Sequence, residues 1–386
     1  EPVVEAPAVE ASGWEFSAQG VVYYQTMGAG TVDLFDQEGA AADAGIQLRA
    51  TNNDVISGIG AGFAVNGLST LNLENSVVSD GMQGTGNLVA GNDVDDVTDG
   101  GWISEAYLTY GFGNTSIKAG RQTLPKSLSP FAYSENWNVF ENTFDSVLVV
   151  NTDIANTTIV GAWVYGGNFN SYGAVASANN MTDFNSLNND DGVYMLTIQN
   201  KSIADLTLTG SYYYAADAGL NDDMTILWGD AAYNAGDFGV AIQGGTVEAG
   251  LPDDMTAFGA KLTGAVSGIN LMAAYSSVED GAMGQLGGTT SALYTNTVSN
   301  ELFNGAFEFN ADKFVVAANT DVLGGNVSAA YAMADSDVTG DTDELNLVYS
   351  TNVTDSLALT AAYVYVDQEL ATDELDVVRV IANYKF

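Results

Sequence analysis

The sequence predicts an all-β fold, a transmembrane antiparallel β-barrel of about 18 strands, with about 16 strands as the alternative. Three observations support this prediction. The composition of 43 Gly, 19 Tyr and 16 Phe against 5 Pro suits many strands joined by turns better than helices. Apolar side chains alternate with small or polar ones along several segments, and short turns alternate with longer connections along the whole chain.

The chain lacks the residues that several classes of function require. It contains no Cys and no His, which excludes disulfides, thiol nucleophiles, the usual zinc sites and a Ser-His-Asp triad. An enzyme is therefore not expected, because the usual general base is missing. The formal net charge of −40 repels nucleic acid and attracts cations, although solubility in a salty environment would also explain it.

The two-residue alternation is clearest in the last ten residues, VVRVIANYKF. One face of this strand would carry Val378, Val380, Ala382, Tyr384 and Phe386, and the other Arg379, Asn383 and Lys385. Residues 357–365 and 59–65 alternate in the same way. A strand of this kind separates two different environments, such as lipid and water.

Turn signals divide the chain into segments of about ten residues. Short turns are expected at residues 52–54, 111–114, 152–156, 200–205, 234–237, 265–268, 322–325 and 351–355. Longer connections alternate with them near residues 28–42, 69–100, 122–142, 169–190, 217–221, 248–253, 279–300, 336–341 and 368–372. Residues 301–322 are predicted to form one long strand, interrupted at most by a bulge, because a turn at 310–313 would make the strand count odd. Tight turns at one end, long loops at the other and an even count are typical of bacterial outer-membrane barrels.

The positions of the aromatic residues and the two ends of the chain agree with this fold. Aromatic residues lie mostly near segment ends, where the interfaces of a membrane would be. Tyr384 and the terminal Phe386 resemble the signal by which such barrels are recognised by the barrel assembly machinery. Residues 1–12, acidic and rich in Pro and Ala, are expected to form a flexible periplasmic tail before a single barrel domain of residues 13–386.

The third long connection, residues 122–142, is the candidate constriction loop. An eighteen-stranded barrel is too wide for its own side chains to fill, so it encloses a water-filled channel. This loop contains Pro125 and Pro130, which restrict its backbone, and four aromatic residues that could hold it against the wall. We expect it to fold inward, and an exposed lid is the alternative.

Residues 117–164 resemble the outer-membrane porin D family, in particular the epsilonproteobacterial, Campylobacter-type porins. The motifs are the GRQ of residues 120–122, the NTF of residues 142–144, and NTDIANTT at residues 151–158. The resemblance implies an eighteen-stranded barrel, often a homotrimer, whose third loop presents acidic residues to basic residues on the wall.

The expected pore-lining residues follow from alternation, from the loop and from this resemblance. Alternation places Arg49, Glu105, Lys261 and Arg379 inward, and Arg121 matches the family motif. Lys118 and Arg121 differ in parity, so both reach the lumen only if a bulge intervenes. The remaining candidates lie in or beside the loop: Lys126, Glu135, Glu141 and Asp145.

An acidic run at Asp93, Asp95, Asp96 and Asp99 is the one candidate metal site. Carboxylates at this density suit calcium, but the spacing does not match an EF-hand, and acidic loops commonly remain hydrated. No cofactor is required by the predicted fold.

These observations lead to one hypothesis and two alternatives. We expect a porin of the bacterial outer membrane, in contact with its lipid and lipopolysaccharide, that passes ions and small hydrophilic solutes and prefers cations. A channel specific for amino acids, peptides or small organic acids is the first alternative. The second is a calcium-binding acidic protein of the surface layer.

Overall fold

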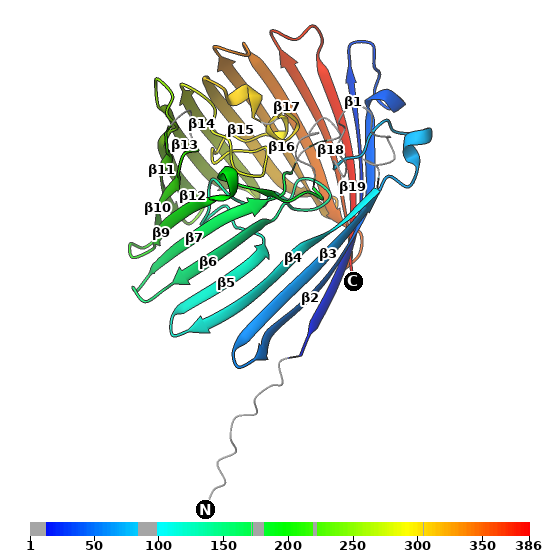
Figure 1. Ribbon diagram of the computed structural model, residues 1–386. Helices are drawn as coiled ribbons and strands as arrows, with labels where there is room; N and C mark the ends of the chain where they lie inside the picture. The colour runs from blue at the N-terminus through cyan, green and yellow to red at the C-terminus, as the bar shows by residue number, and fades with distance from the viewer. Residues whose placement is uncertain (1–12, 84–98, 171, 173–180, 219–221, 304) are drawn as a thin grey trace, which may run out of the picture.

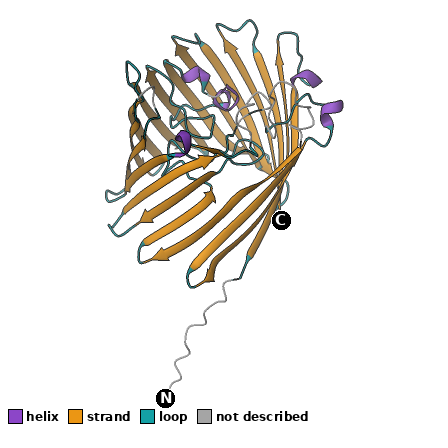
Figure 2. Cartoon of the chain, in the orientation of Figure 1, coloured by secondary structure: helices purple, strands orange, loops and turns teal. Residues whose placement is uncertain are grey.

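The computed structural model describes residues 13–83, 99–170, 172, 181–218, 222–303 and 305–386. Its strands form a single antiparallel sheet that closes on itself, because β1 (Glu15–Ala29) pairs with both β2 (Ala40–Ile56) and β19 (Leu375–Lys385). Figures 1 and 2 show the resulting barrel. Closure leaves no strand edge unpaired, as a lipid environment requires.

The sheet contains 19 strands, but β8 (Asn185–Ser186) pairs only with the end of β7, which also pairs directly with β9. The wall therefore has eighteen strands, which confirms the predicted count and rules out sixteen. The others are β3 (Ile59–Ser69), β4 (Asp99–Phe112), β5 (Thr115–Gln122), β6 (Phe144–Asn151), β7 (Thr157–Gly167), β9 (Val193–Asn200), β10 (Leu206–Ala215), β11 (Met224–Ala235), β12 (Phe238–Glu248), β13 (Met255–Val266), β14 (Ile269–Glu279), β15 (Ala311–Val322), β16 (Gly325–Ser336), β17 (Thr342–Asn352) and β18 (Leu357–Gln368).

Short turns join the described strands at one end of the barrel and longer loops join them at the other. Three of the turns consist of two residues that both have positive φ: Ser57 and Gly58, Ser267 and Gly268, and Leu323 and Gly324. This is the type I′ geometry, whose twist matches that of the paired strands. The turns thus set the register of the hairpins on either side of them.

One predicted strand is wrong in its first half. Residues 301–303 and 305–310 are not strand but belong to the described part of a loop between Glu279 and Ala311, called the 280–310 loop below, and β15 begins only at Ala311. The loop includes α2 (Val298–Phe303) and the short helix η5 (Ala306–Glu308), separated by Gly305 with a φ of 68°. Val298 and Leu302 pack with Phe307 against apolar residues of β18 and β19. Val298 and Leu302 are four positions apart, the spacing that places two side chains on one face of a helix.

The two faces of the wall differ as the alternation predicts. Outward-facing side chains are apolar and exposed, for example Leu108, Ile242 and Val380. The largest buried cluster instead joins inward-facing wall residues such as Tyr213 and Trp228 to residues of the 123–143 and 280–310 segments. No helix in the described parts of the chain is long and apolar enough to cross a membrane.

Candidate functional site

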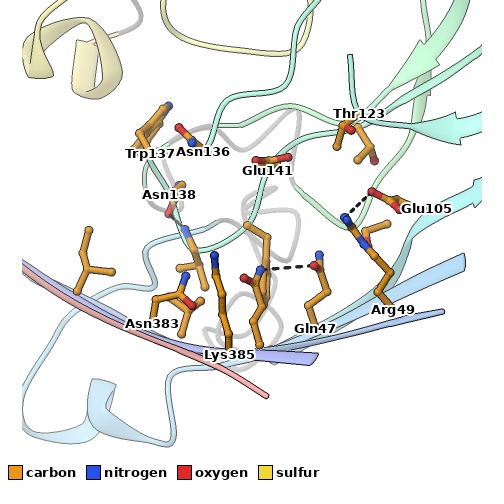
Figure 3. Close-up of a pocket in the computed structure, with 17 residues that line it drawn as sticks. Gln47, Arg49, Glu105, Thr123, Asn136, Trp137, Asn138, Glu141, Asn383 and Lys385 are labelled. Atoms are coloured by element: carbon orange, nitrogen blue, oxygen red, sulfur yellow. Dashed lines mark hydrogen bonds and ion pairs between the residues drawn. The ribbon is translucent and has the colours of Figure 1, made fainter. Parts of the chain in front are cut away.

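A polar pocket of about 380 Å³ lies between the 136–143 segment and the inner faces of β1, β2, β4 and β19. Figure 3 shows Gln47, Arg49 and Lys385 extending from the strands toward the segment that carries Asn136 and Glu141. The pocket lies where the first and last strands close the barrel. It is lined by Gln19, Val21, Gln47, Arg49, Ser104, Glu105, Thr123, Asn136, Trp137, Asn138, Val139, Phe140, Glu141, Thr143, Ile381, Asn383 and Lys385.

The charges of this pocket are of two kinds. Arg49 donates to the Glu105 carboxylate at 2.6 Å, and the Glu105 side chain is only 4% exposed, so these two charges compensate each other. Lys385 on the wall and Glu141 on the facing segment take part in none of the four ion pairs found among the described residues. They are therefore the charges most available to a solute in the pocket.

Burial raises the pKa of Glu141 above the usual range of a glutamate, whereas the nearby Arg49 guanidinium acts in the opposite direction. Glu141 is therefore protonated at a higher pH than a glutamate with the usual pKa. Its negative charge in the pocket is lost at that higher pH as the solution is acidified.

Residues 123–143, which include the part that bounds the pocket, are held to the wall by aromatic contacts. The Phe131 ring lies edge-on to Tyr213 on β10 and Trp228 on β11, with ring centroids 5.6 and 5.3 Å away. The Phe131 N–H also donates to the Tyr213 hydroxyl at 3.2 Å. Further along the segment, Phe140 contacts the Trp102 ring of β4 at 5.9 Å. The segment thus contacts inward-facing residues of strands far apart around the barrel.

Two of the predicted loop residues contact other parts of the chain instead of the pocket. Lys126 donates to the Ser291 carbonyl at 2.6 Å, and burial lowers the pKa of Lys126 to about 8. Glu135 is buried and accepts hydrogen bonds from the 285–290 segment, including the Thr290 N–H at 2.7 Å. Neither residue lines the pocket.

The register of β5 separates Lys118 from Arg121. Lys118 pairs with Thr109, lies over the Tyr107 ring at 3.8 Å and has Glu105 and Arg49 as its charged neighbours, so it is on the inner face. Arg121 pairs with Ala106 instead.

The predicted position of Arg121 in the lumen is therefore corrected. Ala106 shares the outward face of β4 with Leu108, and no register shift separates Lys118 from Arg121. Arg121 forms a two-bond ion pair with Asp145 at 2.8 and 2.9 Å, covered by the Phe184 ring. Simple alternation gives the right face here, and the motif match does not.

Lys261 and Arg379 contact loop residues on the inner side of the wall, and neither lines the pocket. Lys261 lies over the Tyr294 ring at 4.1 Å. Arg379 is buried, donates to Gln25 at 2.6 Å and pairs with Glu301 of α2. Both face inward, as alternation predicts, but each side chain already contacts residues of the 280–310 loop or of a neighbouring strand.

Sequence reasoning missed Lys385 as a site residue, although its alternation with Asn383 and Arg379 indicated the inner face. It also missed the carboxylates that hold the 280–310 loop. Glu344 of β17 accepts from the Ser299 N–H at 3.0 Å and from the Ser299 hydroxyl at 2.6 Å. No sequence pattern links these residues, because they lie far apart along the chain.

Two predictions, the calcium site and the N-terminal tail, have no structural test. Asp93, Asp95 and Asp96 lie outside the described residues, as does the tail of residues 1–12, and Asp99 begins β4 opposite Ser69. The described residues contain no group of three or more Asp, Glu, His or Cys side chains that could hold a metal ion.

The role of the C-terminal aromatic residues in assembly also stays a prediction. Tyr384 and Phe386 are exposed on the outer face, with ring centroids 5.5 Å apart. The backbone of Phe386 exchanges two hydrogen bonds with Ala18, which fixes the end of the chain to β1.

Taken together, a closed eighteen-stranded wall, an apolar outside and a charged inner pocket define a barrel of the outer-membrane porin type. The chain resembles solved structures of this type over nearly its whole length. It is similar to OpdK of Pseudomonas aeruginosa, solved with vanillate, with a TM-score of 0.74, 11% identity and coverage of 96% of this chain and 98% of that one.

Two further structures show the same likeness. OccK3 (OpdO) of Pseudomonas aeruginosa has a TM-score of 0.69 at 14% identity and 96% coverage of both chains. OccAB4 of Acinetobacter baumannii has a TM-score of 0.70 at 12% identity, covering 97% of this chain and 99% of that one. No family model and no curated protein sequence matches the chain. The likeness establishes the fold that the porin D resemblance implied, and the epsilonproteobacterial, Campylobacter-type relationship stays a prediction.

Proposed function

We propose that this protein is a porin of the bacterial outer membrane. It forms a water-filled channel through which ions and small hydrophilic solutes diffuse. The observation that carries this proposal is the charged pocket inside a closed wall whose outer face is apolar. The likeness to solved porin-type barrels supports it.

The 123–143 segment is proposed to narrow this channel. Its support is the set of contacts from Phe131 and Phe140 to inward-facing residues of β10, β11 and β4. With the segment in this position, a solute would pass between Glu141 on one side and Arg49 and Lys385 on the other. Opposed charges across a narrow passage orient polar solutes and disfavour apolar ones.

Cation preference is the expected selectivity. The net charge of −40 attracts cations to both mouths of the channel, and Glu105 compensates Arg49 within it. Lys385 opposes this preference locally, and Glu141 supports it.

Reconstitution of the purified protein into a planar bilayer tests the channel itself. We expect discrete steps of ionic current in potassium chloride as single barrels insert. Protein that retains its folded barrel, shown by anomalous gel migration until it is boiled, but gives no current steps would contradict the proposal. Chemical cross-linking in detergent tests the expected homotrimer in the same preparation.

A second candidate is a channel specific for small organic acids, amino acids or peptides. It is favoured by the placement of Lys385 opposite Glu141, which suits a solute with both a carboxylate and a cationic group. The OpdK structure with vanillate makes an aromatic carboxylate a sensible probe. Saturable block of the potassium current by one class of solute would favour this candidate, and block by none would favour the general porin.

A further inference from the structure

Two long segments of the chain, residues 123–143 and residues 280–310, meet around a single buried carboxylate. Glu135 is only 4% exposed. Its Oε1 accepts from the Gln285 side chain at 2.6 Å and from the Thr290 N–H at 2.7 Å. Its Oε2 accepts from the Thr289 N–H at 3.1 Å and from the Trp137 indole at 2.9 Å. The hydroxyls of Thr289 and Thr290 donate to the same carboxylate.

All of these partners are neutral hydrogen-bond donors. Among the described residues, none of the four ion pairs includes Glu135. Hydrogen bonds to a charged acceptor are about twice as strong as neutral ones, and a buried charge that loses them is costly. Glu135 therefore fixes residues 285–290 more firmly than a neutral side chain in its place would.

Contacts on either side extend this junction. The Tyr133 hydroxyl and the Lys126 ammonium both donate to the Ser291 carbonyl, at 2.9 and 2.6 Å. The Leu286 N–H donates to the Phe131 carbonyl at 2.9 Å. The two segments are thus joined along their length, with Glu135 as the one charged acceptor that gathers donors from both.

The 280–310 loop is in turn attached to three strands of the wall. The Tyr294 hydroxyl donates to Asp230 of β11, Ser299 donates to Glu344 of β17, and Glu301 pairs with Arg379 of β19. The 123–143 segment is attached through Phe131 and Phe140. A body formed by the two segments is therefore held at several points around the barrel.

We propose that Glu135 is a positioning residue that joins these two segments into one body, so that both together fix the width of the channel. Glu135 then has a different role from Glu141, which faces the pocket and acts on passing ions directly. This inference rests on the proposed channel function.

Two variants, one in each segment, test the junction. In Glu135→Gln the amide NH₂ replaces an oxygen at a site where every neighbour is a donor, so at least one hydrogen bond is lost. In Gly288→Ala the added Cβ would lie 2.2 Å from the Gln285 amide nitrogen and 2.6 Å from the Glu135 carboxyl carbon, so this hydrogen-bonded pair must shift.

Two matched controls accompany them. Gly284→Ala adds the same methyl group in the same loop, where nothing lies within 4 Å of the new Cβ. Glu141→Gln makes the same chemical change as Glu135→Gln, but at the pocket. All variants are first checked for heat-dependent gel migration, so that only folded barrels are compared.

The readouts are the single-channel conductance, the fraction of time spent outside the main conductance level, and the reversal potential. We expect Glu135→Gln and Gly288→Ala to increase the time outside the main level by about tenfold, which is the effect expected from the loss of one charge-assisted hydrogen bond. The reversal potential should not change. Gly284→Ala should match the parent. Glu141→Gln should shift the reversal potential and leave the fraction of time outside the main level as in the parent.

The outcomes separate this inference from the proposed function. If the parent forms no channel, the proposed function fails. If the parent conducts and Gly288→Ala is as steady as Gly284→Ala, the junction does not set the channel width. If Glu135→Gln folds and is as steady as the parent, the junction likewise does not set the channel width. If Glu135→Gln does not fold, the comparison of Gly288→Ala with Gly284→Ala tests the inference.

Discussion

At the scale of single residues, acidic side chains of the same type have different functions according to what surrounds them. Glu105 is buried and compensated by Arg49, Glu135 is buried among neutral donors, and Glu141 faces the pocket. Of these three, only Glu141 is thus placed to act on ions in the proposed channel. Its raised pKa makes that action dependent on pH.

Cation preference should decline on mild acidification at a higher pH than a glutamate with the usual pKa would produce. Because the pKa of Glu141 is raised, its carboxylate binds a proton at a higher pH as the pH falls, and its negative charge in the pocket is lost. Reversal potentials measured across a series of pH values test this. In Glu141→Gln the preference should be lower at neutral pH by about twofold in permeability ratio and should lack this part of the pH dependence. An unchanged pH profile in the variant would show that another group titrates.

Arg379→Met should destabilise the barrel by about 3 kcal/mol, because it removes a buried cation and leaves the partly buried Glu301 without its partner. Urea unfolding in detergent measures the change in the free energy of unfolding. Lys201→Met is the control, since Lys201 is exposed in a turn, and should change stability by less than about 0.5 kcal/mol. Equal stability of the two variants would mean that the Arg379–Glu301 pair contributes nothing to the fold.

At the scale of strands and loops, alternation decides which face a residue occupies. Lys118 and Arg121 lie on one strand, three positions apart and on opposite faces. The family motif predicts that Arg121 faces the lumen. The inward-facing cations near the pocket are instead Lys118, Arg49 and Lys385.

The two faces of β5 can be separated by mutation. Lys118→Gln removes an inward cation and should increase the cation preference, whereas Arg121→Gln should leave the reversal potential unchanged. Both variants remove one positive charge, so each is the control for the other. A shift of equal size in Arg121→Gln would contradict the outward position derived from its pairing with Ala106.

The strands could be predicted from the sequence because their signals are local: turn residues, two-residue alternation and connection length. Residues 301–310 could not, because their helical turns form against β18 and β19, and that contact exists only in the closed barrel. The same holds for Glu135. Its burial depends on donors at residues 285–290, about 150 positions further along the chain, which no local pattern reveals.

Pocket residues were predictable in part. Alternation identified the inward faces that carry Arg49 and Glu105, and it also placed Lys385 with Asn383. It gave no information on partners, so it could not distinguish a compensated charge such as Arg49 from one available to solutes such as Lys385.

At the scale of the whole molecule, the closed wall, the attached loops and the net charge of −40 lead to one expectation about transport. In the proposed channel, the wall would exclude lipid, the two loop segments would narrow the lumen, and the acidic surface would concentrate cations at the mouths. The barrel should therefore conduct ions and favour the positive ones.

The reversal potential of the parent protein across a planar bilayer under a potassium chloride gradient tests this most directly. We predict a potential of the sign that marks potassium as the more permeant ion, increasing in size as the salt concentration is lowered and surface charges are less screened. A potential of the opposite sign, marking chloride as the more permeant ion, would contradict the proposed selectivity.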